Sequence, residues 1–256
     1  METHQFETKS FKFPTSCGFC SQIIRPLKKG MHCRLCKLSL HKKCFSEYDI
    51  DCPQQKAGED KTVNDAEERS NRIMDGELDG LFEQILSFIR ENLDEQGLFR
   101  IPGDRTLADS LMKKYEKQPD GEFLHSTPGV GVAEACSLFK LWVGSLGTNL
   151  VPDDDYTEIN NLINQSGVDS SRDRLVELTN SFPERNKDIL LQIVDLLNDV
   201  AANEEKNKMS SLNLAICLSP CLLPPPSGTP PTALVKNLKS CAAYIVFLME
   251  HRDSLE

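Results

Sequence analysis

Apolar residues recur at helical spacing from position 78 towards the end of the chain. The first stripe advances in steps of three and four, and it consists of Leu78, Leu81, Phe82, Ile85, Leu86, Ile89 and Leu93. This spacing places all its members on one face of a helix. Similar stripes lie within residues 104–115, 135–146, 156–163, 189–200, 209–218 and 234–248. No convincing strand alternation interrupts them, so residues 75–256 are predicted to form an all-α domain.

Local breakers mark the ends of these segments. Asp104 follows Pro102-Gly103 and suits a helix start, as does Pro183 before a long stripe. Upstream, residues 54–74 hold no aromatic residue and few apolar ones, which indicates a flexible linker in which residues 65–73 are a candidate helix start. Residues 1–53 then form a separate N-terminal domain.

Composition narrows the class of protein. Hydrophobic residues make up 39% of the 256 positions and charged residues 27%, which excludes global disorder. The longest apolar run, residues 241–249, is about half of the ~20 residues that span a bilayer. The first residues carry neither a cationic flank nor an apolar stretch, so we expect no secretory signal and a cytoplasmic protein.

Charge is divided unevenly along the chain. Residues 1–52 hold nine Lys and Arg against five acidic residues, whereas the whole chain has a net charge of −10. A pI near 5.1 argues against nucleic acid as a partner, because phosphate neutralisation needs a basic surface. Two segments of opposite charge indicate two domains with different partners.

Six of the ten cysteines fall within the first 52 residues. In a reducing compartment such clustering indicates metal ligands rather than disulfides. Two Cys-x-x-Cys pairs and a His-x-x-Cys pair contribute to a set of eight candidate ligands: His4, Cys17, Cys20, Cys33, Cys36, His41, Cys44 and Cys52. Eight ligands fill two closed tetrahedral sites, so we predict two structural zinc ions that supply much of the folding free energy of this short segment.

The full ligand spacing resembles the phorbol-ester/diacylglycerol-type zinc finger of protein kinase C and its relatives. The resemblance implies a small, zinc-stabilised, β-rich finger in which the ligands of the two ions interleave. Carried over, one ion is held by His4, Cys33, Cys36 and Cys52, and the other by Cys17, Cys20, His41 and Cys44.

Lipid binding by this finger is a separate question. Ile23, Ile24 and Leu27 are the candidate lipid-binding residues, with nearby cations available for anionic headgroups. However, Arg25-Pro26 stands where the family usually has Trp-Gly, and the loop is one residue short. Two interpretations stay open: a finger that binds diacylglycerol or an anionic membrane surface, and an atypical finger that packs on the rest of the protein.

The C-terminal segment shows no enzyme motif. It lacks a phosphate-binding loop of the P-loop form, its histidines are isolated, and its cysteines lie in apolar helical runs typical of core packing. A zinc-dependent or cysteine enzyme is therefore disfavoured.

Instead, residues 96–103, Gln-Gly-Leu-Phe-Arg-Ile-Pro-Gly, place an arginine in the turn between the first two helices. Together with residues 139–142, 182–186 and 208–220, this turn resembles the RhoGAP domain, the GTPase-activating module for Rho-family small GTPases. A diacylglycerol-type finger before such a domain also occurs in the chimaerins. The resemblance implies a protein that is not itself an enzyme but stimulates GTP hydrolysis by a GTP-bound Rho, Rac or Cdc42-type partner.

Three residues match functional positions of that family. Arg100 occupies the position of the arginine finger, Lys140 that of a lysine which supports the finger and contacts the GTPase, and Asn213 that of an asparagine which holds the finger loop and the partner. One turn after Lys140, however, Gly144 replaces the usual arginine. A GTPase-binding scaffold with little catalytic effect therefore remains the alternative.

Overall fold

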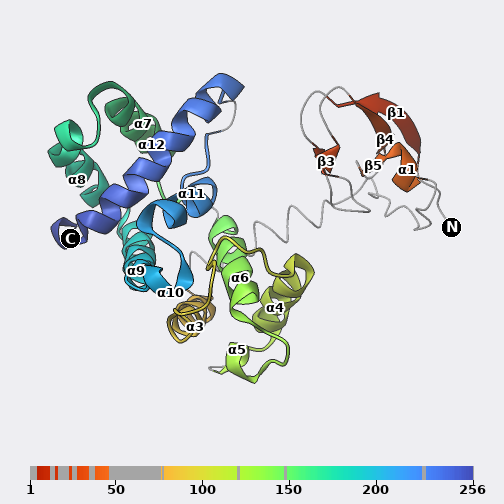
Figure 1. The fold of residues 1–256 in the computed structure, drawn as a ribbon, viewed down its shortest axis with the longest axis horizontal. Helices are drawn as coiled ribbons and strands as arrows, with labels where there is room; N and C mark the ends of the chain where they lie inside the picture. Colours follow the sequence, from red (N-terminus) through yellow and green to blue (C-terminus); the bar gives the residue numbers. More distant parts are fainter. Residues whose placement is uncertain are drawn as a thin grey trace. The chain divides into compact units, whose positions relative to one another are not determined.

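The computed structural model describes residues 5–11, 15–16, 23–24, 28–34, 38–45, 76, 78–119, 122–146, 149–226 and 229–255. The chain divides into two compact units, Met1–Asp65 and Ala66–Glu256, with the division inside the predicted linker. Figure 1 shows the strand-bearing unit and the helical unit, and each is described by itself.

The N-terminal unit is built on short antiparallel strands. Strands β1 (Phe6–Ser10), β4 (Lys29–Cys33) and β5 (Ser39–His41) form one sheet in that order, and β2 (Thr15–Ser16) pairs with β3 (Ile23–Ile24). Helix α1 (Lys42–Phe45) follows β5. A small core forms beneath the sheet from Phe11, Ile24, Leu40 and Cys44. The strand-rich finger that the cysteine spacing implied is confirmed.

Gly30 on β4 shows how closely this core is packed. A Cβ atom at this position would lie 2.6 Å from the carbonyl oxygen of Leu40 and 2.9 Å from the ring of Phe11. No real Cβ tolerates such distances, so only glycine lets β4 and β5 pair over the Phe11 ring.

The C-terminal unit is helical, and the prediction of an all-α domain is confirmed for the part of it that the structure describes. Its longer helices are α3 (Asp79–Arg90), α4 (Arg105–Lys117), α6 (Val132–Gly144), α7 (Asp153–Ser166), α8 (Arg172–Asn180), α9 (Glu184–Ala201), α11 (Ser211–Leu222) and α12 (Pro231–Glu250). One-turn helices α5 (Phe123–Ser126) and α10 (Glu204–Asn207) lie between them. Short 3-10 turns occur at Asp169–Ser171 and Arg252–Ser254.

Most helices begin and end near the expected residues. The Asp104 carboxylate accepts hydrogen bonds from the backbone N–H groups of Thr106 at 2.8 Å and Leu107 at 3.2 Å, so it caps α4. Leu93 lies beyond the end of α3, although the rest of its stripe is buried. Helix α8 was not expected, because its nine residues offer only a short apolar pattern.

Aromatic residues form the centre of the helical core. The indole of Trp142 on α6 stacks on Phe82 of α3 with ring centroids 4.2 Å apart, and its Nε1 donates to the carbonyl of Leu78 at 3.2 Å. A second buried contact in this core joins α12 to α8, where the hydroxyl of Tyr244 lies 2.7 Å from that of Thr179. Helix α12 is long and apolar enough to cross a membrane by length and composition, but Tyr244 and its neighbours line this core instead.

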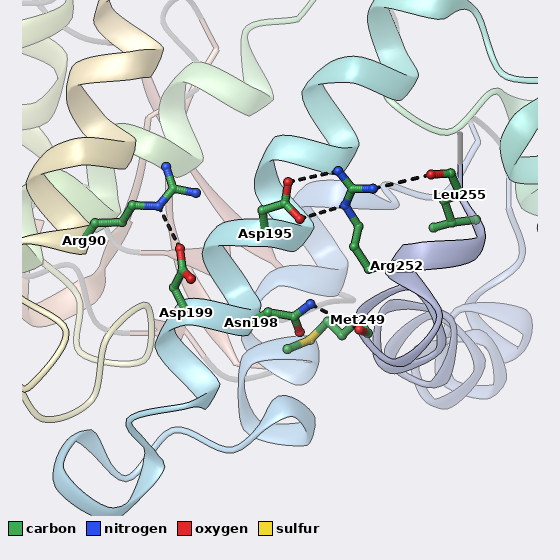
Figure 2. A network of polar contacts seen from close by, with 7 residues as sticks. All are labelled: Arg90, Asp195, Asn198, Asp199, Met249, Arg252 and Leu255. Atoms are coloured by element: carbon green, nitrogen blue, oxygen red, sulfur yellow. Dashed lines mark hydrogen bonds and ion pairs between the residues drawn. The ribbon is translucent and has the colours of Figure 1, made fainter.

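Polar contacts attach α9 to both of its neighbours (Figure 2). Arg252, after α12, forms a bidentate ion pair with Asp195 at 2.7 and 3.0 Å. One turn later, Asp199 accepts from Nε of Arg90 on α3 at 2.8 Å. Helix α9 is thereby fixed between α3 and the end of α12, and its own C-terminus leads directly into the segment that supports the candidate site.

Candidate functional site

Arg100 lies in the loop that joins α3 to α4. Its side chain is exposed, and among the described residues no hydrogen bond or ion pair engages its guanidinium. Its backbone N–H donates to the carbonyl of Gly97 at 2.9 Å, and so does that of Ile101. Gly97 has a φ of +78°, and a Cβ there would lie 2.7 Å from the Ile101 side chain, so the turn requires glycine. The loop thus combines an ordered backbone with an unengaged cation.

Phe99, directly before Arg100, anchors the loop in the core. It is 2% exposed and meets Phe139 of α6 edge to face, with ring centroids 5.2 Å apart. Its φ of +62° is unusual for a bulky residue and costs about 1–3 kcal/mol, which burial of the ring has to offset. This left-handed conformation turns the chain sharply, so that Phe99 is buried while Arg100 faces solvent.

Lys140 on α6 contacts the same peptide. Its Nζ donates to the carbonyl oxygen of Phe99 at 2.7 Å, a short charge-assisted hydrogen bond. The structure therefore brings Lys140 to the backbone that carries Arg100.

Asn207, at the end of α10, holds the other side of the loop. Its own carbonyl oxygen accepts from Gly97 N–H at 2.9 Å. Its fully buried side chain donates to the carbonyls of Leu93 and Val200 at 2.9 and 2.8 Å, and accepts from the N–H of Met209 at 2.8 Å. One side chain therefore joins the ends of α3 and α9 to the start of α11. No sequence pattern indicates this role, because an asparagine in a polar stretch usually indicates a solvated turn.

Asn213 lies in the first turn of α11, next to this junction. Its side-chain amide donates to the carbonyl of Lys208 at 3.4 Å, and its N–H donates to the capping Ser210 hydroxyl at 3.2 Å. Lys208 has a φ of +62°, which ends α10 and redirects the chain into α11. Asn213 is thus connected to the Arg100 loop through Lys208 and Asn207, and it is half-buried.

Exposed apolar residues flank these polar groups. Ile101 follows Arg100 and is 51% exposed, while Leu212 and Ile216 lie one turn apart on α11 and are 56% and 55% exposed. Large apolar side chains left in solvent beside functional groups are typical of protein interaction surfaces. The combination therefore favours a protein partner over a small substrate.

A cavity of about 550 Å³ lies between α6 and α11. Its lining includes Lys140, Gly144, Cys217 and Cys221. A Cβ at Gly144 would meet nothing within 4 Å, so a side chain fits there without rearrangement. The departure from the family pattern at this position leaves open space.

Two thiols near this site, those of Cys136 and Cys221, are poor nucleophiles because they are buried. Burial raises the pKa of Cys136 to about 12 and that of Cys221 to about 11. Both thiols stay protonated at neutral pH, and the thiolate is the reactive form. These values agree with the interpretation of the helical cysteines as packing residues.

Of the eight predicted zinc ligands, the structure describes Cys33, His41 and Cys44. The other five, His4, Cys17, Cys20, Cys36 and Cys52, lie outside the described residues. Nδ1 of His41 and Sγ of Cys44, both assigned to the second site, lie 3.8 Å apart. Two such ligands of one tetrahedral zinc ion would be separated by about 3.6 Å. The described pair therefore fits a shared zinc ion.

One candidate lipid-binding residue needs correction. Ile24 is 1% exposed and belongs to the small core with Phe11 and Leu40, because its strand turns the side chain inward. It would have to leave that core to enter a lipid layer. Ile23 is described only as a strand residue, and Leu27 lies outside the described residues.

Comparison with known proteins places both units. The family model described as the RhoGAP domain matches residues 80–227, and the phorbol esters/diacylglycerol binding domain (C1 domain) matches residues 4–55. Beta-chimaerin of Rattus norvegicus is 23% identical and matches 99% of this chain and 86% of its own length. Unconventional myosin-IXa of the same species is 22% identical over 95% of this chain, which spans only 9% of that myosin.

Solved structures show the same fold. The BH domain from Graf, the GTPase regulator associated with focal adhesion kinase, superposes with a TM-score of 0.58 at 20% identity, covering 67% of this chain and 90% of its own. Human Rho GTPase activating protein 15 gives a TM-score of 0.60 at 17% identity, covering 67% and 81%. The chain therefore belongs to the RhoGAP family and carries an N-terminal C1 domain.

Proposed function

We propose that this protein stimulates GTP hydrolysis by a Rho-family small GTPase, and that Arg100 enters the partner's nucleotide site as an arginine finger. The observation that carries the proposal is the loop itself: an exposed, unengaged guanidinium follows directly on a buried and hydrogen-bonded peptide. The protein acts on the active site of its partner and has no reaction of its own.

The chemistry requires a cation in this position. Charge on the phosphate oxygens grows during GTP hydrolysis, and a small GTPase alone neutralises it poorly. A guanidinium is permanently charged, planar and able to donate two hydrogen bonds. An arginine supplied in trans raises the rate by about 10³–10⁵, which corresponds to roughly 4–7 kcal/mol of barrier.

Lys140 and Asn213 serve this finger from two sides. Lys140 holds the Phe99 carbonyl, and Asn213 belongs to the junction that holds Gly97. Both are available to the partner as well, since each is half-buried beside exposed apolar residues. Fixing the loop beforehand lowers the entropy that Arg100 loses when it enters the partner's site.

Single-turnover GTP hydrolysis, measured over a panel of Rho, Rac and Cdc42-type proteins, tests the proposal. We expect the wild-type chain to accelerate at least one of them, and Arg100→Ala to lose at least ~10²-fold in the maximal rate while the complex still forms. Arg172→Ala, at an exposed arginine that begins α8, is the matched control and should keep full activity.

The result distinguishes two hypotheses, a GTPase activator with an arginine finger and a GTPase-binding scaffold. Acceleration that survives Arg100→Ala would overturn the finger. Binding without acceleration by the wild-type chain would support the second candidate, a GTPase-binding scaffold. Gly144 is the observation that favours this second candidate, because α6 lacks a cation one turn beyond Lys140.

For the N-terminal unit we propose two structural zinc ions, one held by His4, Cys33, Cys36 and Cys52 and the other by Cys17, Cys20, His41 and Cys44. The separation of His41 and Cys44 supports the second set. Metal analysis should find about two zinc ions per chain.

We further propose that this C1 domain brings a cytoplasmic protein to membranes that contain diacylglycerol. Sedimentation with vesicles that contain or lack diacylglycerol tests this proposal.

A further inference from the structure

The cations of the helical unit are unevenly placed. Residues 75–256 carry 29 acidic and only 16 basic side chains, yet four of the basic ones, Arg105, Lys113, Lys114 and Lys117, lie on α4. Elsewhere in the described unit many cations are neutralised by ion pairs, as Arg90, Arg174, Arg185, Lys206 and Arg252 are. Among the described residues, none of the four α4 cations has such a partner. A basic surface therefore interrupts a strongly acidic domain.

The geometry of α4 concentrates these cations on one side. Its buried residues, Ala108, Leu111, Met112 and Tyr115, define the inner face against α6. At 100° per residue, the opposite face holds Thr106, Ser110, Lys113, Lys114 and Lys117, which we name the α4 stripe. Figure 1 shows α4 beside α6 at the edge of the helical unit, and all five residues of the α4 stripe are exposed.

The α4 stripe also lines a hollow in the surface. A shallow hollow of about 660 Å³ is lined by its five members together with Asp109. Two hydroxyl groups, of Thr106 and Ser110, precede the three ammonium groups along the helix. Hydroxyl and ammonium groups together are donors that suit phosphate oxygens. Lys114 is also placed over the ring of Phe123, with its Nζ 5.3 Å from the centroid.

We propose that the α4 stripe is a membrane contact of the RhoGAP domain itself, specific for the phosphate-bearing headgroups of anionic lipids. It acts in addition to the C1 domain and without any apolar insertion. Its role is to hold the helical unit at the same surface that the C1 domain reaches.

A membrane fits this surface better than an acidic protein does. A protein interface of ordinary strength has an apolar centre with a polar rim, and the stripe contains no apolar residue. A planar layer of anionic headgroups needs only exposed cations on an open and shallow helix face. The same chain contains a domain whose family is described as binding phorbol esters and diacylglycerol, which are membrane ligands.

The size of the effect follows from the charges. A lysine near an anionic leaflet contributes about fivefold to membrane partitioning at physiological salt. Replacing Lys113 and Lys117 by glutamine should therefore reduce partitioning about 25-fold. Ionic screening should abolish most of the contribution at about 0.5 M salt.

The experiment sediments the full chain with vesicles of phosphatidylcholine containing about 30 mol% phosphatidylserine and no diacylglycerol. We expect Lys113→Gln/Lys117→Gln to bind about 25-fold more weakly than wild type. The matched control is Lys236→Gln/Lys239→Gln, which removes the same charge from exposed positions on α12 and should stay within about threefold. Equal melting temperatures verify that each variant is folded.

Two outcomes overturn the proposal. Equal weakening of binding by the stripe variant and by the α12 control would show that only net charge matters. Alternatively, the stripe variant lowers stimulation of GTP hydrolysis in solution, without vesicles, which would make α4 a contact for an acidic protein. Since solution activity of the wild-type chain is measured in the same series, failure of the stripe is distinguishable from failure of the GTPase-activating function.

Discussion

The two units of this chain are stabilised by different means. In the described part of the N-terminal unit, the buried apolar core consists of Phe11, Ile24, Leu40 and Cys44, and one of these is a predicted zinc ligand. In the helical unit, a continuous core runs through all the long helices and includes fully buried Trp142. A core of the first kind cannot fold a domain of this size without a metal, whereas the second kind can.

This difference decides how each unit can be tested. In the helical unit, Arg100 is exposed and contributes nothing to the core, so its removal separates activity from folding. In the finger, a ligand such as Cys44 is both part of the core and part of the proposed zinc site. Function and stability are therefore separable in one unit and joined in the other.

Metal removal should produce the largest difference in stability between the two units. Structural zinc sites contribute about 10–16 kcal/mol of binding free energy to folding, so a chelator should unfold the N-terminal unit. The helical unit should keep its circular dichroism and its melting temperature. Limited proteolysis followed by mass spectrometry should locate all new cleavage before residue 66.

Single ligand variants provide the control for chelation. Cys33→Ser and Cys44→Ser each remove one ligand from a different proposed site, whereas Cys241→Ser changes a buried cysteine of α12 that lies outside both sets. We expect the first two, and not the third, to lower the zinc content. Retention of two zinc ions by either ligand variant would contradict the assignment.

Asn207→Ala should lower both the stability of the helical unit and its stimulation of GTP hydrolysis. It leaves the carbonyl of Leu93 and the N–H of Met209 without their hydrogen-bond partner and removes one of the two bonds to the Val200 carbonyl, which costs about 3 kcal/mol of unfolding free energy. Because the side chain positions the peptide whose carbonyl oxygen accepts from Gly97 N–H, we also expect a loss of about tenfold in maximal stimulation. Urea unfolding and single-turnover hydrolysis measure the two effects.

Asn203→Ala is the matched control for that variant. Among the described residues, its side chain makes one hydrogen bond, to the carbonyl of Asp199 at 3.0 Å, and it is half-buried. We expect about 1 kcal/mol of destabilisation and unchanged stimulation. An Asn207 variant that is destabilised but fully active at saturating concentration would show that the loop needs no support from this junction.

The contrast between Asn207 and Asp104 shows how far the sequence predicts this domain. Asp104 was expected to start a helix because capping depends on neighbours in the chain, and the structure shows that it does. The role of Asn207 depends on Leu93, which lies more than a hundred positions earlier. A local sequence pattern carries no information about such a contact. The sequence therefore predicts the loop that carries Arg100 but not the role of Asn207 in holding it.

The same limit explains the differences in the finger. The ligand spacing is a local pattern and identified the domain, whereas the side of the sheet occupied by Ile24 depends on how β2 pairs with β3. An apolar residue in a short loop is equally compatible with a lipid-facing rim and with a core. Pairing of strands, and not hydrophobicity, decided between the two.

Lys140→Met tests whether the loop depends on one charged hydrogen bond. Methionine keeps the aliphatic packing of the stem but cannot donate to the Phe99 carbonyl. We expect a loss of about tenfold in stimulation, equivalent to about 1.4 kcal/mol, with a smaller change in unfolding free energy. Lys187→Met on α9 removes a comparable half-buried lysine and should leave hydrolysis unchanged. Equal losses in both variants would point to net charge rather than to loop support.

Gly144→Arg should have the smallest effect. It tests whether a cation one turn beyond Lys140 on α6 strengthens GTPase binding. The position has open space and ends the helix, so an arginine fits, favours the helix, and places a cation near the helix C-terminus one turn beyond Lys140. We expect about threefold to tenfold tighter binding of the GTPase, measured by titration of a labelled, GTP-analogue-bound partner, with the maximal rate unchanged. Gly144→Ala gains the same helix propensity, about 1 kcal/mol, without the charge. If alanine tightens binding as much as arginine does, helix stability and not the missing cation limits this face, and the structural reason for considering a weak scaffold disappears.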